Sequence, residues 1–251
     1  MDISLKDHFI LKWKEYFNNA DLPITFYYSD ILSGAEPASK SHEWNCLICQ
    51  LAEVRKGRSL AFSKETVTCG GGKMYLGFTE KRRPGFEFFL SCGIEGKMEG
   101  ERYIRKPEMV LELMKRQTMI PAPGKYIVFK RWDKLEESDC PEVVIFFGTP
   151  DVLSGLFTLA NYDQSEPNST ISPFGSGCGS IVHYPYMEKD FDRPRAVIGM
   201  FDPSARPCVP QGTLSFSVPY NKFTKMISYM DESFLITNSW KKVRKRIGSG
   251  T

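Results

Sequence analysis

The chain has 251 residues, 41% of them hydrophobic and 25% charged, which is the composition of an ordinary globular protein long enough to bury a sizeable core. Its formal net charge is only +3 at pH 7, and five positive charges fall within residues 241–246, so the rest of the chain is mildly acidic and we expect no nucleic-acid partner. No run of about 18 apolar residues predicts a membrane span, and an acid at position 2 with no apolar segment after it argues against a signal peptide, so we expect a cytoplasmic protein without a membrane partner.

The N-terminal segment predicts an amphipathic helix. Ser4 can cap this helix, and Asp7 completes a capping-box pattern. Its apolar side chains recur at helical spacing: Phe9, Ile10, Trp13, Tyr16 and Phe17. The β-branched and aromatic run over residues 24–28 then predicts a strand, and residues 33–40, with a glycine and a proline among small polar residues, predict a loop.

A second helix is predicted over residues 43–56, and Gly57 ends it. Its apolar stripe at i, i+4 and i+7 consists of Leu47, Leu51 and Val54. At about 100° per residue, Cys46 and Cys49 lie about 60° apart and well off this stripe. The two thiols could therefore share one ligand.

Residues 69–72, a cysteine followed by three glycines, predict a turn. Glycine admits positive φ and lets a ligand or a second segment approach the backbone closely. A short strand is expected before this turn, over residues 59–63. Residues 81–84 predict a solvated break after it, and the apolar residues 86–90 are compatible with either a strand or a helix.

The middle of the chain contains the best candidate for a boundary between lobes. Pro107 predicts the start of a helix that ends near Arg116, and residues 121–124 predict a turn. We expect a single domain over residues 1–251, with a lobe boundary near residues 119–125.

A continuous apolar run over residues 143–147 predicts a strand covered on both faces. Thr149 and Pro150 directly after it have the pattern of an N-cap and a first helical residue, and predict a helix. Two further strands are expected over residues 126–132 and 196–201.

In the C-terminal part, residues 214–218 alternate apolar residues with serine and predict a half-buried strand. Pro219 opens the next helix, and residues 234–247 predict the last one. Before these elements, the polar loop 163–173 leads into the glycine-rich segment 175–180. Strands and helices follow one another without a regular βαβ repeat, so we expect an α+β fold with helices packed on a mixed sheet, in two lobes.

The seven cysteines are expected to be reduced thiols, metal ligands or core residues rather than disulfides, because no export signal is seen and their number is odd. A closed zinc or iron–sulfur site needs about four converging thiolates. The candidate metal ligands are Cys46, Cys49, Cys69 and Cys178. Only the first pair has ligand spacing, and the simpler interpretation is that these residues are small buried hydrophobes.

The glycine-rich segments would let a cofactor approach the backbone. The candidate cofactor-binding residues are Gly70, Gly71, Gly72, Gly177, Gly179, Ser180 and Arg206. Residues 175–180 could form an anion nest, although they lack the spacing and the lysine of a phosphate-binding Walker loop. The guanidinium of Arg206 offers a bidentate fork for a carboxylate or phosphate, and its simpler interpretation is a surface ion pair.

The thiols have two conceivable catalytic uses. A thioredoxin-like pair wants its first thiol at a helix N-terminus, and the helix predicted around Cys46 and Cys49 begins before both. Cys178 as a nucleophile would want a base such as His183, and a tight loop beside a surface histidine is the simpler interpretation. His8 and His42 are expected at the surface.

Several motifs together resemble those of a known family. They are Cys46, Ala52, residues 55–57, 69–72, 75–78 and 144–146, Thr149 with Pro150, residues 177–180, Ala205 with Arg206, and residues 216–219. Over about residues 10–235 the chain resembles the domain-of-unknown-function family 169 of bacteria and archaea. The resemblance implies one unit, found often in anaerobes and without an established activity, in which Cys69, Cys178 and their glycines are a shared feature and Cys49 is less regular.

Three functions follow as hypotheses. The first is a protein that binds a metal, an iron–sulfur cluster or a small redox cofactor in a glycine-lined pocket to which Cys46, Cys69 and Cys178 converge. The second is an enzyme that acts on a small acidic metabolite, with Cys178 or Cys69 as nucleophile and Arg206 as the anchor for the acid. The third is a structural or partner-binding module. The sequence does not fix the oligomeric state.

Overall fold

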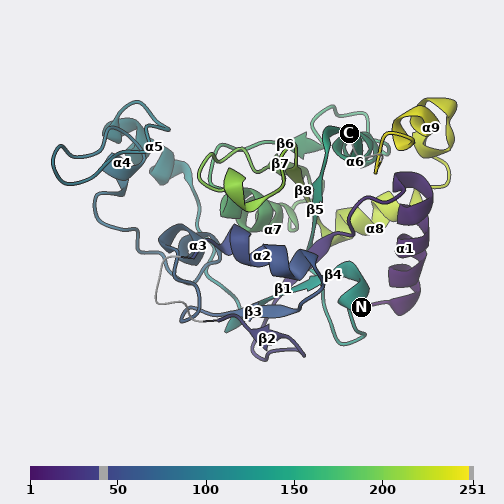
Figure 1. The fold of residues 1–251 in the computed structure, drawn as a ribbon, viewed down its shortest axis with the longest axis horizontal. Coiled ribbons are helices and arrows are strands. Elements are labelled where there is room, and N and C mark those ends of the chain that lie inside the picture. The colour runs from purple at the N-terminus through teal and green to yellow at the C-terminus, as the bar shows by residue number, and fades with distance from the viewer. Residues whose placement is uncertain (40–44, 249–251) are drawn as a thin grey trace.

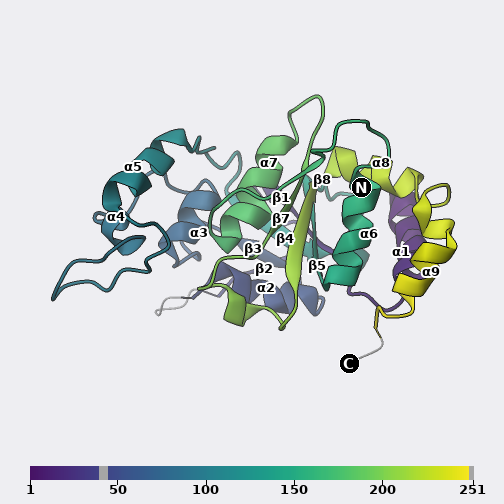
Figure 2. The ribbon, with the colours of Figure 1, turned by 90° about the horizontal axis from the view of Figure 1, so that it is seen from above.

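The computed structural model describes residues 1–39 and 45–248. Its strands form one mixed sheet in the order β2-β3-β4-β1-β5-β8-β7-β6, with helices packed on both faces (Figures 1 and 2), which confirms the α+β class. The strands are β1 (Ile24–Ser29), β2 (Glu36–Pro37), β3 (Leu60–Phe62), β4 (Tyr126–Arg131), β5 (Val143–Gly148), β6 (Thr170–Ile171), β7 (Ala196–Gly199) and β8 (Leu214–Pro219). The pairs β2–β3 and β6–β7 are parallel, and the other neighbours are antiparallel.

The helices surround this sheet. They are α1 (Ile3–Phe17), α2 (Leu47–Arg55), α3 (Gly70–Tyr75), α4 (Phe86–Phe89), α5 (Pro107–Arg116), α6 (Pro150–Ala160), α7 (Tyr184–Glu188), α8 (Tyr220–Ser228) and α9 (Asn238–Arg244), with short 3-10 turns η1 (Trp132–Lys134), η3 (Arg206–Cys208) and η4 (Phe234–Ile236), and a π-helix η2 (Gly179–His183). The predicted helices after Pro107, Thr149 and Pro219 are confirmed. The apolar segment 86–90 is resolved as the helix α4. The last predicted helix is interrupted at Thr237, whose side chain caps α9.

Strand β5 explains why the core has two halves. Side chains alternate between the two faces of a strand. Val143, Ile145 and Phe147 therefore face one hydrophobic cluster, under α2, α3 and α7. Val144 and Phe146 face the other cluster, under α1, α6, α8 and α9. All of β5 except Gly148 is buried. The prediction of a strand covered on both faces is confirmed.

The predicted half-burial of β8 is wrong. This strand lies between β5 and β7 inside the sheet, so both of its faces are covered. Ser215 and Ser217, which the alternating pattern placed toward solvent, are 0% exposed. Their hydroxyls have no hydrogen-bond partner among the described residues.

Two local predictions at the N-terminal end also need correction. Helix α1 begins at Ile3 and is capped by Asp2, whose Oδ1 accepts from the Leu5 N–H at 3.2 Å, rather than by Ser4. The predicted loop 33–40 contains the short strand β2. The described residues do not include residue 40, the last of this predicted loop. They also do not include His42 or residues 43 and 44, the first two of the predicted helix 43–56.

Residues 78–121 form an excursion away from the sheet-bound part of the chain. The two ends of this excursion meet at Gly77 and Ala122. The carbonyl of Gly77 accepts from the Ala122 N–H at 2.9 Å. A Cβ at Gly77, where φ is +76°, would lie 2.4 Å from that nitrogen, so only glycine fits. This excursion carries α4 and α5 at one end of the molecule (Figures 1 and 2). The single-domain organisation with a lobe boundary near residues 119–125 stays a prediction.

In the described part of the chain, we find no helix with the length and apolar character that crossing a membrane requires.

Candidate functional site

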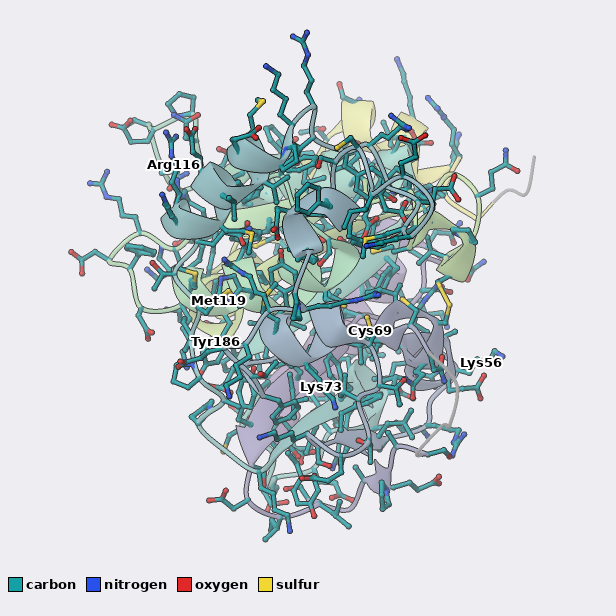
Figure 3. All side chains as sticks on the ribbon, turned by 90° about the vertical axis from the view of Figure 1, so that its left-hand side faces the viewer. Lys56, Cys69, Lys73, Arg116, Met119 and Tyr186 are labelled. Carbon is teal, nitrogen blue, oxygen red and sulfur yellow. A yellow bond between two sulfur atoms is a disulfide. The ribbon has the colours of Figure 1, made fainter. Side chains whose placement is uncertain are left out.

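A cavity of about 950 Å³ lies between the excursion and the sheet-bound part of the chain. One wall is made by α3, the start of η2 and the segment 199–205 after β7, and the other by residues 79–117. Figure 3 looks onto this end of the molecule and labels Cys69 and Lys73 on α3. The two glycine-rich segments therefore meet at one site, although they are more than a hundred residues apart in sequence.

The first glycine-rich segment is a helix start, so the prediction of a turn is wrong. Cys69 is the N-cap of α3, and its Sγ accepts from the Gly72 N–H at 3.5 Å. None of the three glycines has positive φ. A Cβ at Gly70 would meet nothing within 4 Å, whereas one at Gly72 would lie 3.1 Å from Val67. Gly70 and Gly71 thus leave this wall of the cavity open, and only at Gly72 would a Cβ be tightly packed.

The second glycine-rich segment is also helical from Gly177 onward and continues as the π-helix η2. The open anion nest predicted there is not formed, because its amides already have partners. The Gly177 N–H donates to Asp202 Oδ2 at 3.1 Å, and the Gly179 N–H donates to Ser176 Oγ at 3.2 Å. A carboxylate of the chain itself occupies the place that an anionic ligand would take.

Gly179 and Ser180 are held by protein contacts. A Cβ at Gly179 would lie 3.3 Å from the Tyr75 ring, and Gly179 is not among the residues that line the cavity. Ser180 does line it, and its Oγ donates to the Gly177 carbonyl at 2.9 Å and accepts from the Met200 N–H at 3.3 Å.

Three free thiols face the cavity: Cys46, Cys69 and Cys178. Burial raises the pKa of the Cys178 thiol well above its ordinary value, and the neighbouring Cys69 and Cys46 add to that shift. Burial also raises the pKa of Cys46, although the N–H groups of Ile48 and Cys49 act in the opposite direction. Neither Cys46 nor Cys178 is an activated thiolate near neutral pH.

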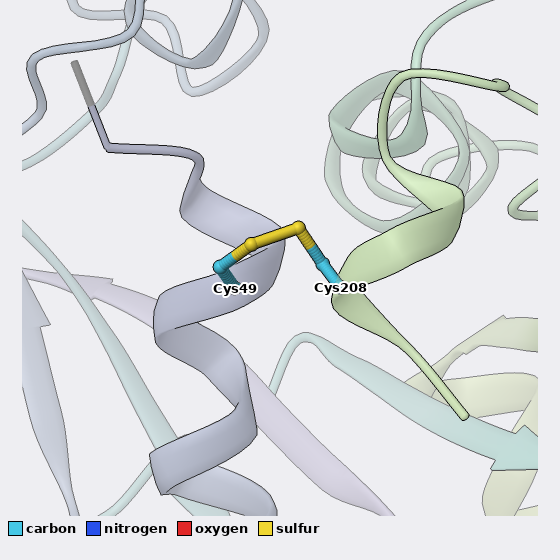
Figure 4. The surroundings of a disulfide bond; sticks show 2 residues. All are labelled: Cys49 and Cys208. Atoms are coloured by element: carbon cyan, nitrogen blue, oxygen red, sulfur yellow. A yellow bond between two sulfur atoms is a disulfide. The ribbon is translucent and has the colours of Figure 1, made fainter.

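The other candidate ligand, Cys49, is bonded to Cys208 (Figure 4). The expectation that the cysteines are not in disulfides is therefore wrong for these two. The fold places α2 beside η3, so that residues 159 positions apart meet with their Cα atoms 4.6 Å apart. No spacing signal pointed to Cys208, because a long-range pairing has none.

The disulfide brings a third sulfur, that of Cys208, close to Cys46 and Cys49. Among the described residues, Cys46, Cys49 and Cys208 are the set of three metal-binding side chains whose ligand atoms all lie within 4.8 Å of one another. The predicted set of four is thus divided: Cys49 belongs to this group, Cys69 and Cys178 lie on the cavity wall, and Cys46 belongs to both.

Arg206 is placed away from its predicted role. Its Nη1 donates to the carbonyls of Met200, at 3.3 Å, and Thr213, and it is not among the residues that line the cavity. The guanidinium therefore holds main chain behind the wall instead of facing a ligand.

The basic side chains that do line the cavity were missed by the sequence analysis. They are Lys64, Lys73, Lys81, Arg82 and Arg83, against only two acidic residues, Glu101 and Asp202. Arg82 donates to the Met114 carbonyl at 3.2 Å. Within the described part of the chain none of the five forms an ion pair. The only signal was the basic run 81–83, which is equally typical of a solvated loop.

Comparison with known proteins gives one match. The family model DUF169, described as "Uncharacterised ArCR", matches residues 16–229. No curated protein and no solved structure matches the chain. The match agrees with the resemblance seen in the motifs, and it attaches no ligand or reaction to the cavity.

Proposed function

The chain belongs to the uncharacterised family DUF169, and from that premise we propose that it binds a cofactor-sized small molecule with an acidic group and an apolar body. The observation that carries the proposal is the cavity of about 950 Å³, which combines free thiols, basic side chains without an ion pair among the described residues, and aromatic side chains.

The size of the cavity favours an organic ligand over a bare ion. Small-molecule sites usually measure about 300–1,000 Å³, and this cavity of about 950 Å³ is near the upper end of that range. A metal ion alone would leave nearly all of it to water.

The lining determines the chemistry of the ligand. Its apolar part includes Phe86, Phe89, Phe174 and Phe201, which would stack on or cover an apolar body. The five basic side chains outnumber the two acidic ones, and one of these, Asp202, is already engaged by the Gly177 N–H. A ligand with an anionic group would therefore complement the excess positive charge of this lining.

The thiols favour a redox cofactor within this class. Cys46, Cys69 and Cys178 lie on one wall, where a thiol can exchange electrons or form an adduct with a bound electrophile. The raised pKa of Cys178 counts against the alternative in which this residue is a ready nucleophile for an acidic metabolite. The displaced Arg206 also removes the proposed anchor of that alternative.

Native mass spectrometry of the purified protein tests the proposal, followed by denaturation and identification of any released compound. We expect a released anionic compound, and about tenfold weaker rebinding to the Lys73→Gln and Arg83→Gln variants, because each removes a charge-assisted contact. Lys241→Gln, on α9, is the matched control and should rebind normally. The proposal fails if no compound is released and a panel of flavin, nicotinamide and nucleotide cofactors causes no thermal shift.

The second candidate is a metal ion or an iron–sulfur cluster held by Cys46, Cys49, Cys69 and Cys178. Cys46 links the two halves of this set, because its sulfur lies within 4.8 Å of that of Cys49 and it contributes with Cys69 to the raised pKa of Cys178. The candidate requires the Cys49–Cys208 bond to be reduced because a disulfide cannot supply thiolates. Protein purified anaerobically would then carry zinc or iron at about one site per chain and lose it on oxidation. Metal-free reduced protein without charge-transfer absorption would exclude this candidate.

A further inference from the structure

A free thiol lies beside the disulfide. The sulfurs of Cys46, Cys49 and Cys208 are all within 4.8 Å of one another, and only the last two are bonded. Cys49 is exposed to solvent, whereas Cys46 is half-buried and lines the cavity. The three residues therefore span the wall from its outer surface to its inner surface.

We propose that Cys46, Cys49 and Cys208 form a thiol–disulfide exchange site, in which the disulfide moves between an outer position, Cys49–Cys208, and an inner position, Cys46–Cys49. The substrate class of the site is small thiols and their disulfides in solvent, which reach the exposed Cys49, while Cys46 carries the exchange to the cavity wall. This activity is separate from ligand binding in the cavity.

The exchange step is balanced without an external oxidant or reductant. Because burial raises the pKa of Cys46, its thiol first gives up its proton to solvent, and only the deprotonated fraction reacts. Its sulfur then attacks the Cys49 sulfur; the Cys46–Cys49 bond forms while the Cys49–Cys208 bond breaks. The electron pair of the broken bond remains on Cys208, which leaves as thiolate and takes up the proton that Cys46 released. One disulfide and one thiol are present before and after the step.

The geometry of α2 suits the inner position. Cys46 is the N-cap of this helix, with an extended backbone at φ −68° and ψ 130°, and Cys49 is the third helical residue. Side chains at these two positions face each other across the first turn, as in a capping box. A Cys-x-x-Cys pair at a helix N-terminus is also the arrangement of dithiol oxidoreductases. A helix start before Cys46, as predicted from the sequence, argued against this motif, and the structure puts that start at Leu47.

The exchange has a consequence for the cavity. The outer disulfide joins α2 to η3, which directly follows the cavity-lining segment 199–205. A Cβ at Gly177 would lie 3.3 Å from Ile48 of α2 and 3.2 Å from Ala205, so the elements pack at one point. When the disulfide moves to the inner position, the covalent link between α2 and η3 is lost and Cys46 is no longer a free thiol. The redox state of thiols in solvent is thereby coupled to the lining of the cavity.

Disulfide mapping of acid-quenched, alkylated protein tests the proposal. In Cys208→Ser under air oxidation we expect the Cys46–Cys49 disulfide, and in Cys46→Ser only Cys49–Cys208. Cys92→Ser, which removes an exposed free thiol, is the matched control and should give the wild-type pattern. Finding Cys46 and Cys49 both as free thiols in folded, air-oxidised Cys208→Ser would overturn the proposal.

A second measurement does not depend on that variant. The full-length wild type is incubated with mixtures of reduced and oxidised glutathione, quenched with acid and alkylated. Because exchange reaches both positions of the disulfide, part of the wild type and of Cys92→Ser should carry the Cys46–Cys49 disulfide with Cys208 alkylated, whereas Cys46→Ser should carry none. Absence of the Cys46–Cys49 disulfide from the wild type at every ratio would reject the proposal.

Discussion

Loss of the long-range disulfide should lower the stability of the protein by a predictable amount. The Cys208→Ser change is conservative in size at a half-buried position, so it leaves packing nearly intact and removes mainly the cross-link. The effect then arises largely in the unfolded state, which gains conformational freedom when a loop is opened.

The magnitude follows from the lengths of the loops. Closing a loop of 159 residues stabilises the folded state by about 5 kcal/mol in the chain-entropy relation, as an upper value. If Cys46 and Cys49 pair in the variant, the short loop they close returns about 2 kcal/mol in the same relation. The expected net loss is about 3 kcal/mol, or roughly 6–12 °C in Tm for a chain of this size.

Urea unfolding followed by tryptophan fluorescence, with and without a phosphine reductant, measures this loss. We expect wild type and Cys92→Ser to be equally stable without reductant and Cys208→Ser to be weaker. With reductant all three should converge. Equal stability of Cys208→Ser and wild type in the absence of reductant, with no effect of reductant on either, would refute the cross-link and the reasoning built on it.

Three further outcomes are expected. Gly199→Ala should lose about 1–3 kcal/mol in the same urea assay, because the added Cβ would lie 2.1 Å from the Cβ of Ser180; an unchanged midpoint would contradict this packing. Since burial raises the pKa of Cys178, iodoacetamide should modify it more than about tenfold more slowly than the exposed Cys92 at pH 7.5, with the gap closing toward alkaline pH and after denaturation; equal rates in the folded protein would count against it. Burial lowers the pKa of Lys222, so between this lowered pKa and 10.5 the unfolded chain holds more protons than the folded one. The free energy of unfolding therefore rises with pH in that window; Lys222→Met should remove this rise, and a persisting slope would assign it to another group.

The parts of the fold that could be predicted are those specified by local pattern. The apolar run of β5 and the Thr149-Pro150 helix start were found because both faces of the strand are buried and because the first helical turn tolerates proline. Strand β8 shows the limit. Its serine alternation is typical of a strand with one wet face, and its position between β5 and β7 is decided by pairings with distant segments, which the local pattern does not contain.

The candidate site illustrates the same limit for glycine. A run of three glycines is a poor helix former, yet Gly70 begins α3 because Met74 and Tyr75 are buried against the core and tertiary packing outweighs the propensity. Cysteine and glycine composition was therefore enough to select the segments that meet at the cavity, and not enough to give their conformation. The basic run 81–83 and Cys208 reach the site only through long-range contacts.

Cys46 is the residue at which the two proposals can be separated. It lines the cavity and also lies beside the disulfide. Arg83 lines the cavity but does not belong to the group of sulfurs. Arg83→Gln should weaken ligand binding and leave the disulfide pattern unchanged, because Arg83 carries no thiol and the exchange takes place among Cys46, Cys49 and Cys208. Cys46→Ser should abolish exchange; if it also releases the ligand while the outer disulfide remains intact, the thiol itself contacts the ligand, and the cavity and the exchange site are parts of one redox centre.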